Sequence, residues 1–217
     1  MEMEKEENHY LELFGVSRAN LESLMAGALS SGAGFADIYF ECTSYTNLLL
    51  KDSQVTSGGY HEDFGAGIRV LCGERTGYSY CETTERRDME AAVRAASAIC
   101  AAGGGSQAVR AGRQSGRRIC ADMYGNTLEK AAVGRKSRSG LYEMTESWES
   151  CSRRKMADML KKIEEKLRRR EPRTVKVIAQ ISDSVSRVMM YNSLGELTFE
   201  TRPMGSVSVS AVFSGHG

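Results

Sequence analysis

The fold is decided by the stretch from Ala36 to Cys81, which reads ADIYFECTSYTNLLLKDSQVTSGGYHEDFGAGIRVLCGERTGYSYC. Apolar and polar residues alternate in it, as they do in a strand with one buried face. The clearest runs are Ala36, Ile38, Phe40 and Cys42, and then Ala66, Ile68, Val70 and Cys72. Only short turns separate the runs, so neighbouring strands have to be antiparallel. We expect a meander of four or five strands.

Amphipathic helices flank this meander. Ser17 is a residue type that caps helices, and apolar residues follow it at helical spacing. A second stripe follows Thr83 and Thr84. The two stripes are Leu21, Leu24, Met25, Ala28 and Leu29, and Met89, Ala92, Val93, Ala96 and Ile99. We therefore predict a first α+β unit over residues 18–102, after a frayed N-terminus over residues 1–17.

Residues 103–140 differ in composition from the rest. They carry eight basic residues against two acidic ones, with almost no periodic apolar signal. Such a segment buries too little surface to offset its ordering entropy. We expect a flexible, basic, Gly-rich linker here, with a short helix near residues 128–133.

A second α+β unit is expected over residues 141–217. Ser152 would cap a helix that Pro172 ends, and Trp148 would pack against it. Its stripe is Met156, Met159, Leu160, Ile163 and Leu167, and alternating runs follow at 175–181, 185–191, 197–201 and 207–213. The predicted fold class is thus α+β, with two helix-then-antiparallel-meander units whose helices pack on one face of the sheet. The last strand, Val207 to Phe213, leaves an open edge.

Length and charge narrow the class of protein. The 217 residues can bury a sizeable core, and the net charge of +1 gives no overall attraction to nucleic acid or membrane. Local basic runs lack the interleaved aromatics of single-strand binding, so nucleic-acid contact is not expected. No signal peptide or run of membrane-spanning length is evident. We expect a cytoplasmic protein whose six cysteines are reduced thiols.

No catalytic or metal-binding set emerges from the residues. His61-Glu62 lacks a second histidine one helical turn later, and it lies at an expected hairpin bend. Around His61, a nucleophile would have to be Cys42, Cys72 or Cys81, and the alternation favours a core role for the first two. We therefore predict no catalytic residue, no metal ligand and no cofactor in this chain.

The order of short motifs resembles the TldD/PmbA family, also called modulators of DNA gyrase, and is closer to its TldD branch. The first half carries Ala36-Asp37, then Asp63, Gly65, Gly67 and Arg69, then Thr76, Gly77, Tyr78 and Tyr80. The second half carries Glu171-Pro172-Arg173, Asp183-Ser184, Asn192-Ser193 with Gly195, and Arg202-Pro203. The likeness covers residues 18–102 and 141–213, and we expect these motif residues to be structural.

The resemblance implies the N-terminal scaffold and substrate-admission domain of a TldD-type zinc metalloprotease that cleaves extended or unfolded peptides. The family's zinc site, a His-Glu-x-x-x-His helix with a further Cys ligand, lies in a C-terminal domain that we expect this chain to lack. Zinc is thus expected only there, and this chain alone is expected to be inactive. The family also implies a homodimer or a heterodimer with a paralogous subunit.

Two other readings stay open. The chain could be a stand-alone regulatory or binding module that dimerises, or a basic nucleic-acid adaptor that acts through residues 103–140. If the chain is instead the N-terminal part of a TldD-type protease, the open edge near Val207 to Phe213 would bind either the missing domain or a peptide.

Overall fold

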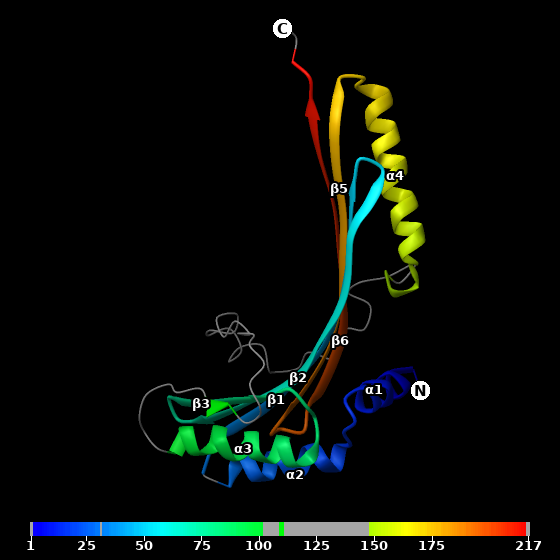
Figure 1. Ribbon diagram of the computed structural model, residues 1–217. Coiled ribbons are helices and arrows are strands. Elements are labelled where there is room, and N and C mark those ends of the chain that lie inside the picture. The colour runs from blue at the N-terminus through cyan, green and yellow to red at the C-terminus, as the bar shows by residue number, and fades with distance from the viewer. Residues whose placement is uncertain (1, 31, 102–108, 111–147, 216–217) are drawn as a thin grey trace. The chain divides into compact units, whose positions relative to one another are not determined.

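The computed structural model describes residues 2–30, 32–101, 109–110 and 148–215, and its strands form one sheet (Figure 1). In space the strands follow the order β4-β3-β2-β1-β5-β6. They are β1 (Phe35–Lys51), β2 (Gln54–Cys72), β3 (Arg75–Cys81), β4 (Val109–Arg110), β5 (Thr174–Asn192) and β6 (Leu197–Phe213). With helices packed against this sheet, the predicted α+β class is confirmed.

The helices are α1 (Glu2–Leu13), α2 (Arg18–Leu29), α3 (Arg86–Ala101) and α4 (Arg153–Arg170), with a short 3-10 turn, η2, at Trp148–Ser150. Two of the helices, α2 and α4, begin directly after the serines that the sequence predicted as caps. The Ser17 hydroxyl accepts a hydrogen bond from the Asn20 N–H at 3.3 Å, and the Ser152 hydroxyl accepts one from the Lys155 N–H at 3.2 Å. Both predicted N-caps are therefore confirmed. Within the described residues, no helix is long and apolar enough to cross a membrane.

Pairing between β1 and β5 joins the two halves of the sequence. The Ser193 N–H donates to the Ala36 carbonyl at 2.8 Å, the Thr43 hydroxyl donates to Ser186 Oγ at 2.7 Å, and the Asp52 N–H donates to the Val177 carbonyl at 3.0 Å. From one of these contacts to the next, the residue number on the β1 side increases by as much as the number on the β5 side decreases. This is an antiparallel pair in constant register.

The strands are longer and fewer than expected. The prediction of four or five strands between Ala36 and Cys81 is wrong, because β1, β2 and β3 account for the whole stretch. Gly58 and Gly59 resemble a turn signal, but they lie inside β2, where a Cβ would come within 3.0 Å of the Leu48 side chain and 2.9 Å of the Asn47 side chain. These glycines make room for neighbouring side chains rather than turning the chain.

The same correction applies to the second half. Its four predicted runs form only β5 and β6, so Asp183-Ser184 and Arg202-Pro203 lie within strands. Proline lacks an N–H, and β6 is an outermost strand of the described sheet, the kind of strand in which proline is tolerated. The Asn192-Ser193 motif with Gly195 forms the turn between β5 and β6: Gly195 has a φ of +81°, and the Asn192 side chain accepts the N–H groups of Leu194 and Glu196.

The N-terminal segment is helical rather than frayed. Tyr10 is 5% exposed and Phe14 is fully buried. Tyr10 stacks on Phe199 at 5.0 Å between ring centroids, and Phe14 lies 5.3 Å from Phe40 and 5.7 Å from Phe64. Tyr10 in α1 and Phe14, directly after its last residue, therefore pack this segment against the aromatic side chains of the sheet.

Two compact units make up the chain, and both are discontinuous in sequence. Unit 1 comprises residues 1–41, 64–141 and 188–200, and unit 2 comprises residues 42–63, 142–187 and 201–217. The predicted division was into consecutive segments, 18–102 and 141–217. The difference arises because β1, β2, β5 and β6 each contribute residues to both units.

The predicted linker, 103–140, lies almost wholly outside the described residues, and so does the short helix expected at 128–133. Its described part is β4, which runs parallel to β3 with Val109 opposite Ser79 and Arg110 opposite Tyr80.

In unit 1, α3 packs closely on β3 beside α2 (Figure 1). A Cβ on Gly77 would overlap the Ala96 carbonyl and lie 3.0 Å from the Cys100 backbone nitrogen. At the same end of α3, Cys100 forms a disulfide with Cys72 of β2. The expectation of six reduced thiols is wrong for this pair, because the fold brings their Cα atoms to 5.9 Å, within disulfide range.

We predict that Gly77→Ala destabilises the protein by about 1–3 kcal/mol, because the added methyl group forces α3 away from β3. Gly34→Ala is the matched control, since no described atom lies within 4 Å of its Cβ position, and it should change stability by less than about 0.5 kcal/mol. Urea unfolding of both variants gives the comparison. Equal midpoints would contradict the close packing.

Candidate functional site

The motif residues of unit 1 include a buried ion pair. Arg69 of β2 donates through Nε to Asp37 Oδ1 at 3.2 Å and through Nη2 to Asp37 Oδ2, and Asp37 is only 6% exposed. A bidentate arginine of this kind fixes the position of a carboxylate and occupies it. The pair therefore holds β1 and β2 together and engages both carboxylate oxygens of Asp37.

The motif glycines serve packing between β2 and β3. A Cβ on Gly65 would lie 2.7 Å from the Cys81 carbonyl oxygen, and Gly67 lies under the Tyr78 ring, which is 41% exposed. Of the remaining motif residues, Asp63 is exposed on β2 and Thr76 is exposed on β3, where it pairs with Leu71. The structural role expected for the motif residues as a set stays a prediction.

The candidate nucleophiles are buried or already bonded. Burial, with a smaller contribution from the Asp88 charge, raises the pKa of the Cys81 thiol to about 11, so little thiolate forms near neutral pH. Cys72 is in the disulfide, and Cys42 is buried. His61 lies within β2, not at the predicted bend, and its ring stacks on Tyr45 at 4.4 Å.

The described residues do not fit a metal ion. Over the ranges that the structure covers, no three His, Cys, Asp or Glu side chains converge on a point where a cation could bind. A catalytic zinc needs three protein ligands and an open position. The zinc that the family resemblance implies therefore has no ligand set among these residues.

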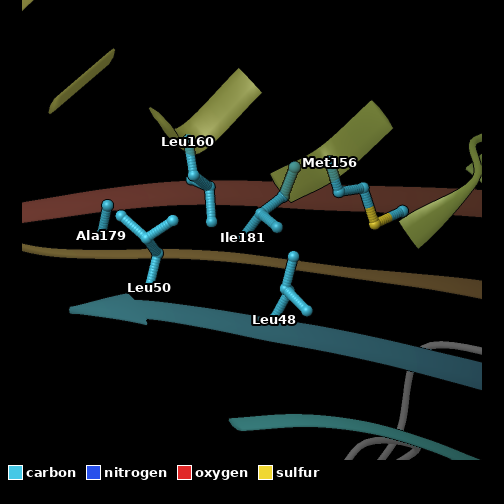
Figure 2. Packing of buried hydrophobic residues seen from close by; sticks show 6 residues of the cluster. All are labelled: Leu48, Leu50, Met156, Leu160, Ala179 and Ile181. Atoms are coloured by element: carbon cyan, nitrogen blue, oxygen red, sulfur yellow. The ribbon is translucent and has the colours of Figure 1, made fainter. Parts of the chain in front are cut away.

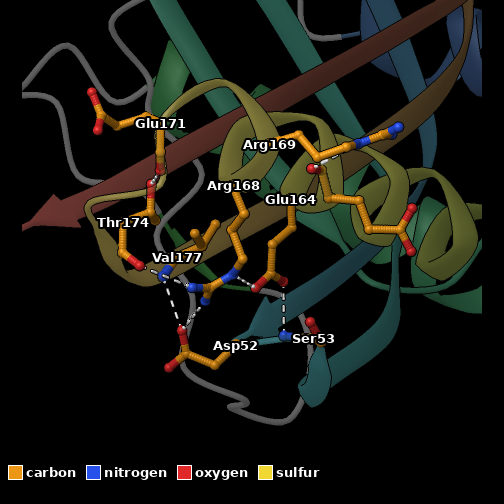
Figure 3. A network of polar contacts seen from close by, with 9 residues as sticks. Asp52, Ser53, Glu164, Arg168, Arg169, Glu171, Thr174 and Val177 are labelled. Carbon is orange, nitrogen blue, oxygen red and sulfur yellow. Dashed lines mark hydrogen bonds and ion pairs between the residues drawn. The ribbon is translucent and has the colours of Figure 1, made fainter.

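Unit 2 contains a polar network around a buried carboxylate (Figure 3). Glu164 of α4 is 1% exposed, and it accepts the Ser53 N–H at 2.7 Å and Arg168 Nε at 2.7 Å. Arg168 also donates to Asp52 Oδ1 at 2.9 Å, and that oxygen accepts the Val177 N–H at 2.9 Å. The network ties α4 to the β1–β2 turn and to β5.

The β1–β2 turn that this network contacts has an uncommon backbone conformation. Asp52 and Ser53 have φ values of +47° and +66°, which is the left-handed conformation of a tight hairpin turn. The contact between Glu164 and this turn was not predicted, because nothing in the local sequence pattern marks Glu164 as buried.

A hydrophobic cluster lies under α4 (Figure 2). Met156 and Leu160 of the helix meet apolar side chains from β1 and β5, namely Leu48, Leu50, Ala179 and Ile181. Trp148 packs against this cluster, as predicted. The cluster and the Glu164 network together fix α4 on the sheet of unit 2.

The Glu-Pro-Arg motif lies between α4 and β5. Arg173 donates through Nε and Nη2 to the two Glu171 carboxylate oxygens, each at 2.8 Å. These hydrogen bonds lower the pKa of Glu171 to about 2. The Arg173 carbonyl also accepts the Ser214 N–H at 2.9 Å, so the end of β6 is held next to the start of β5.

One open edge of unit 2, within the described residues, is the outer edge of β6. This strand lies last in the described sheet, with β5 on its inner side. Trp148 covers Gly205, where a Cβ would come within 2.5 Å of the indole ring. Beyond Gly205 the side chains of Val207, Val209 and Phe213 are 40–48% exposed. The predicted open edge is therefore the candidate functional site.

We predict that Glu164→Ala destabilises unit 2 by about 1–3 kcal/mol, because it leaves the Ser53 N–H without its acceptor. Glu165→Ala, one position along on the exposed face, should cost less than about 0.5 kcal/mol. Fluorescence of Trp148, the single tryptophan, reports unfolding of this unit. Equal losses in the two variants would show that the network does not support α4.

Family models match both halves of the chain. Residues 36–100 match the PmbA/TldA metallopeptidase domain 1, and residues 146–217 match the PmbA/TldA metallopeptidase central domain. Together the two matches cover more than half of the chain.

Individual proteins agree with these matches. A metalloprotease TldD homolog of Haemophilus influenzae is 22% identical over 183 residues, covering 84% of this chain and 34% of the relative. A candidate modulator of a DNA gyrase from Thermotoga maritima shares the fold with a TM-score of 0.63 and 19% identity, covering 90% of this chain and 40% of that one.

A second such structure, from Bacteroides thetaiotaomicron, has a TM-score of 0.65 and 17% identity, covering 92% of this chain and 41% of that one. The chain thus spans about one third of the length of the curated relative. On the family models and the relatives together, the chain belongs to the PmbA/TldD family.

Proposed function

We propose that this chain forms the scaffold and substrate-admission part of a TldD-like zinc metalloprotease, and that it presents extended or unfolded peptides to a metal centre outside the described residues. Two findings support the proposal. The chain matches metallopeptidase domain 1 and the central domain of the family, and the Haemophilus relative is a metalloprotease TldD homolog.

The edge of β6 is the observation on which the proposal rests. An edge strand offers unpaired backbone N–H and C=O groups, and an extended peptide can pair with them as one further strand. Such pairing uses the main chain, so it tolerates many peptide sequences. This tolerance suits a protease that acts on unfolded segments.

In this proposal, the groups that carry out hydrolysis lie outside the described residues. A zinc peptidase activates a water molecule with the metal and a general base. Two buried carboxylates have structural partners: Asp37 pairs with Arg69, and Glu164 accepts the Ser53 N–H. In this proposal the chain is inactive alone, works in the cytoplasm, and assembles as a homodimer or as a heterodimer with a paralogous subunit.

A second candidate function is dimerisation through the same edge. Residues 206–211 alternate serine with small apolar residues. In an antiparallel pair of two β6 strands, serines would therefore lie opposite serines on one face, and apolar side chains opposite apolar side chains on the other. In that case the chain is a binding or regulatory module, and a peptide would compete with the second copy.

We predict that a saturating extended peptide slows amide exchange in Val207 to Phe213 at least tenfold, because each added hydrogen bond protects an N–H. Hydrogen exchange by mass spectrometry gives the measurement, with β1, which has a neighbour on each side, as the unchanged reference. Identical rates with and without peptide throughout β6 would refute peptide admission at this edge. Protection that rises with chain concentration in the absence of peptide would favour dimerisation.

A further inference from the structure

The two faces of β6 differ in chemistry. Residues two apart on a strand share a face, so Val207, Val209, Ala211 and Phe213 lie on the same face as Gly205. The Trp148 ring covers Gly205, and it therefore marks the start of this face. We call these four residues the apolar row. Three of them, Val207, Val209 and Phe213, are 47%, 40% and 48% exposed.

The opposite face is polar along its centre. Ser206, Ser208 and Ser210 alternate with the apolar row, and all three are exposed. Ser206 shares a hydrogen bond of 2.9 Å with Ser182 of β5, which lies beside it on this face. We call these three residues the serine row. A strand that pairs with β6 would thus meet apolar side chains on one face and, on the other, three hydroxyl groups flanked by the exposed side chains of Met204 and Val212.

The edge also lacks the features that usually prevent strand addition. Natural edge strands carry lysines or other charges, prolines or bulges that discourage a further strand. From Met204 to Phe213 the sequence contains no charged residue and no proline, and Pro203 ends the pairing surface on one side. A charged side chain of an incoming segment would find no opposite charge on these ten residues. An uncharged segment is the occupant that this edge fits.

We propose, on the basis of the peptide-admission function above, that the β6 edge selects uncharged extended segments in which apolar residues alternate with small polar ones. Side chains directly opposite on paired strands contact each other, so the alternation of β6 dictates that of its partner. A shift of one residue would place apolar side chains against the serine row. The edge therefore recognises the alternation of apolar and polar residues in a peptide rather than a particular sequence.

Two synthetic peptides of equal composition test this inference. One alternates valine and serine over eight residues, the other carries the same residues as one valine block and one serine block, and both have a lysine at each end for solubility. Titration with the intact chain is followed by Trp148 fluorescence and by exchange of the β6 amides. We expect the alternating peptide to bind about tenfold more tightly, since three apolar cross-strand pairs contribute.

Two variants test which face of β6 causes the preference for the alternating peptide. Val209→Ser interrupts the apolar row and should reduce the preference to about threefold or less. Ser208→Thr is the matched control on the serine row, because it keeps the hydroxyl, and it should retain the full preference. Equal loss of preference in both variants would overturn the assignment of the two faces.

The outcomes separate this inference from the function on which it rests. Equal binding of the two peptides, with equal protection of β6, would overturn pattern selection and leave peptide admission intact. No protection of β6 by either peptide would overturn both. Protection that needs only a higher concentration of the chain itself would assign the edge to a second copy and would also overturn the inference.

Discussion

Pairing between β1 and β5 is the interaction on which the rest of the structure depends. These strands come from opposite halves of the sequence, and hydrogen bonds near both ends and the middle of β1 keep them in one register. Because β1 occupies one edge of β5, β6 has the other edge, and its own outer edge faces no further described strand. The open edge is thus a consequence of how the two halves join.

Several contacts hold the helices on the sheet to which the β6 edge belongs. In unit 1, Gly77 lets α3 approach β3 at backbone distance, and the Cys72–Cys100 disulfide ties the same end of the helix. In unit 2, Glu164 and the cluster under α4 hold the helix on β1 and β5. A rigid strand edge loses little conformational entropy when a partner pairs with it, which favours binding.

Local chemistry could be predicted from the sequence because its signals act over a few residues. The caps at Ser17 and Ser152 and the turn at Asn192 to Gly195 need only their neighbours. The strand lengths could not be predicted, since a glycine that makes room for the Asn47 side chain looks the same as a glycine in a turn. The helical N-terminus, the burial of Glu164 and the disulfide depend on contacts between distant segments. The open edge at Val207 to Phe213 was predicted. Which residues share the face that Trp148 covers became known only from its contact with Gly205.

The central claim is that this chain positions peptides and that the hydrolytic metal lies elsewhere. The most direct test is the zinc content of the purified chain after incubation with excess zinc and removal of unbound metal, combined with peptide cleavage assayed with and without a chelator. The account predicts far less than one zinc ion per chain and no chelator-sensitive cleavage. One tightly held zinc ion per chain, with cleavage that the chelator abolishes, would contradict it.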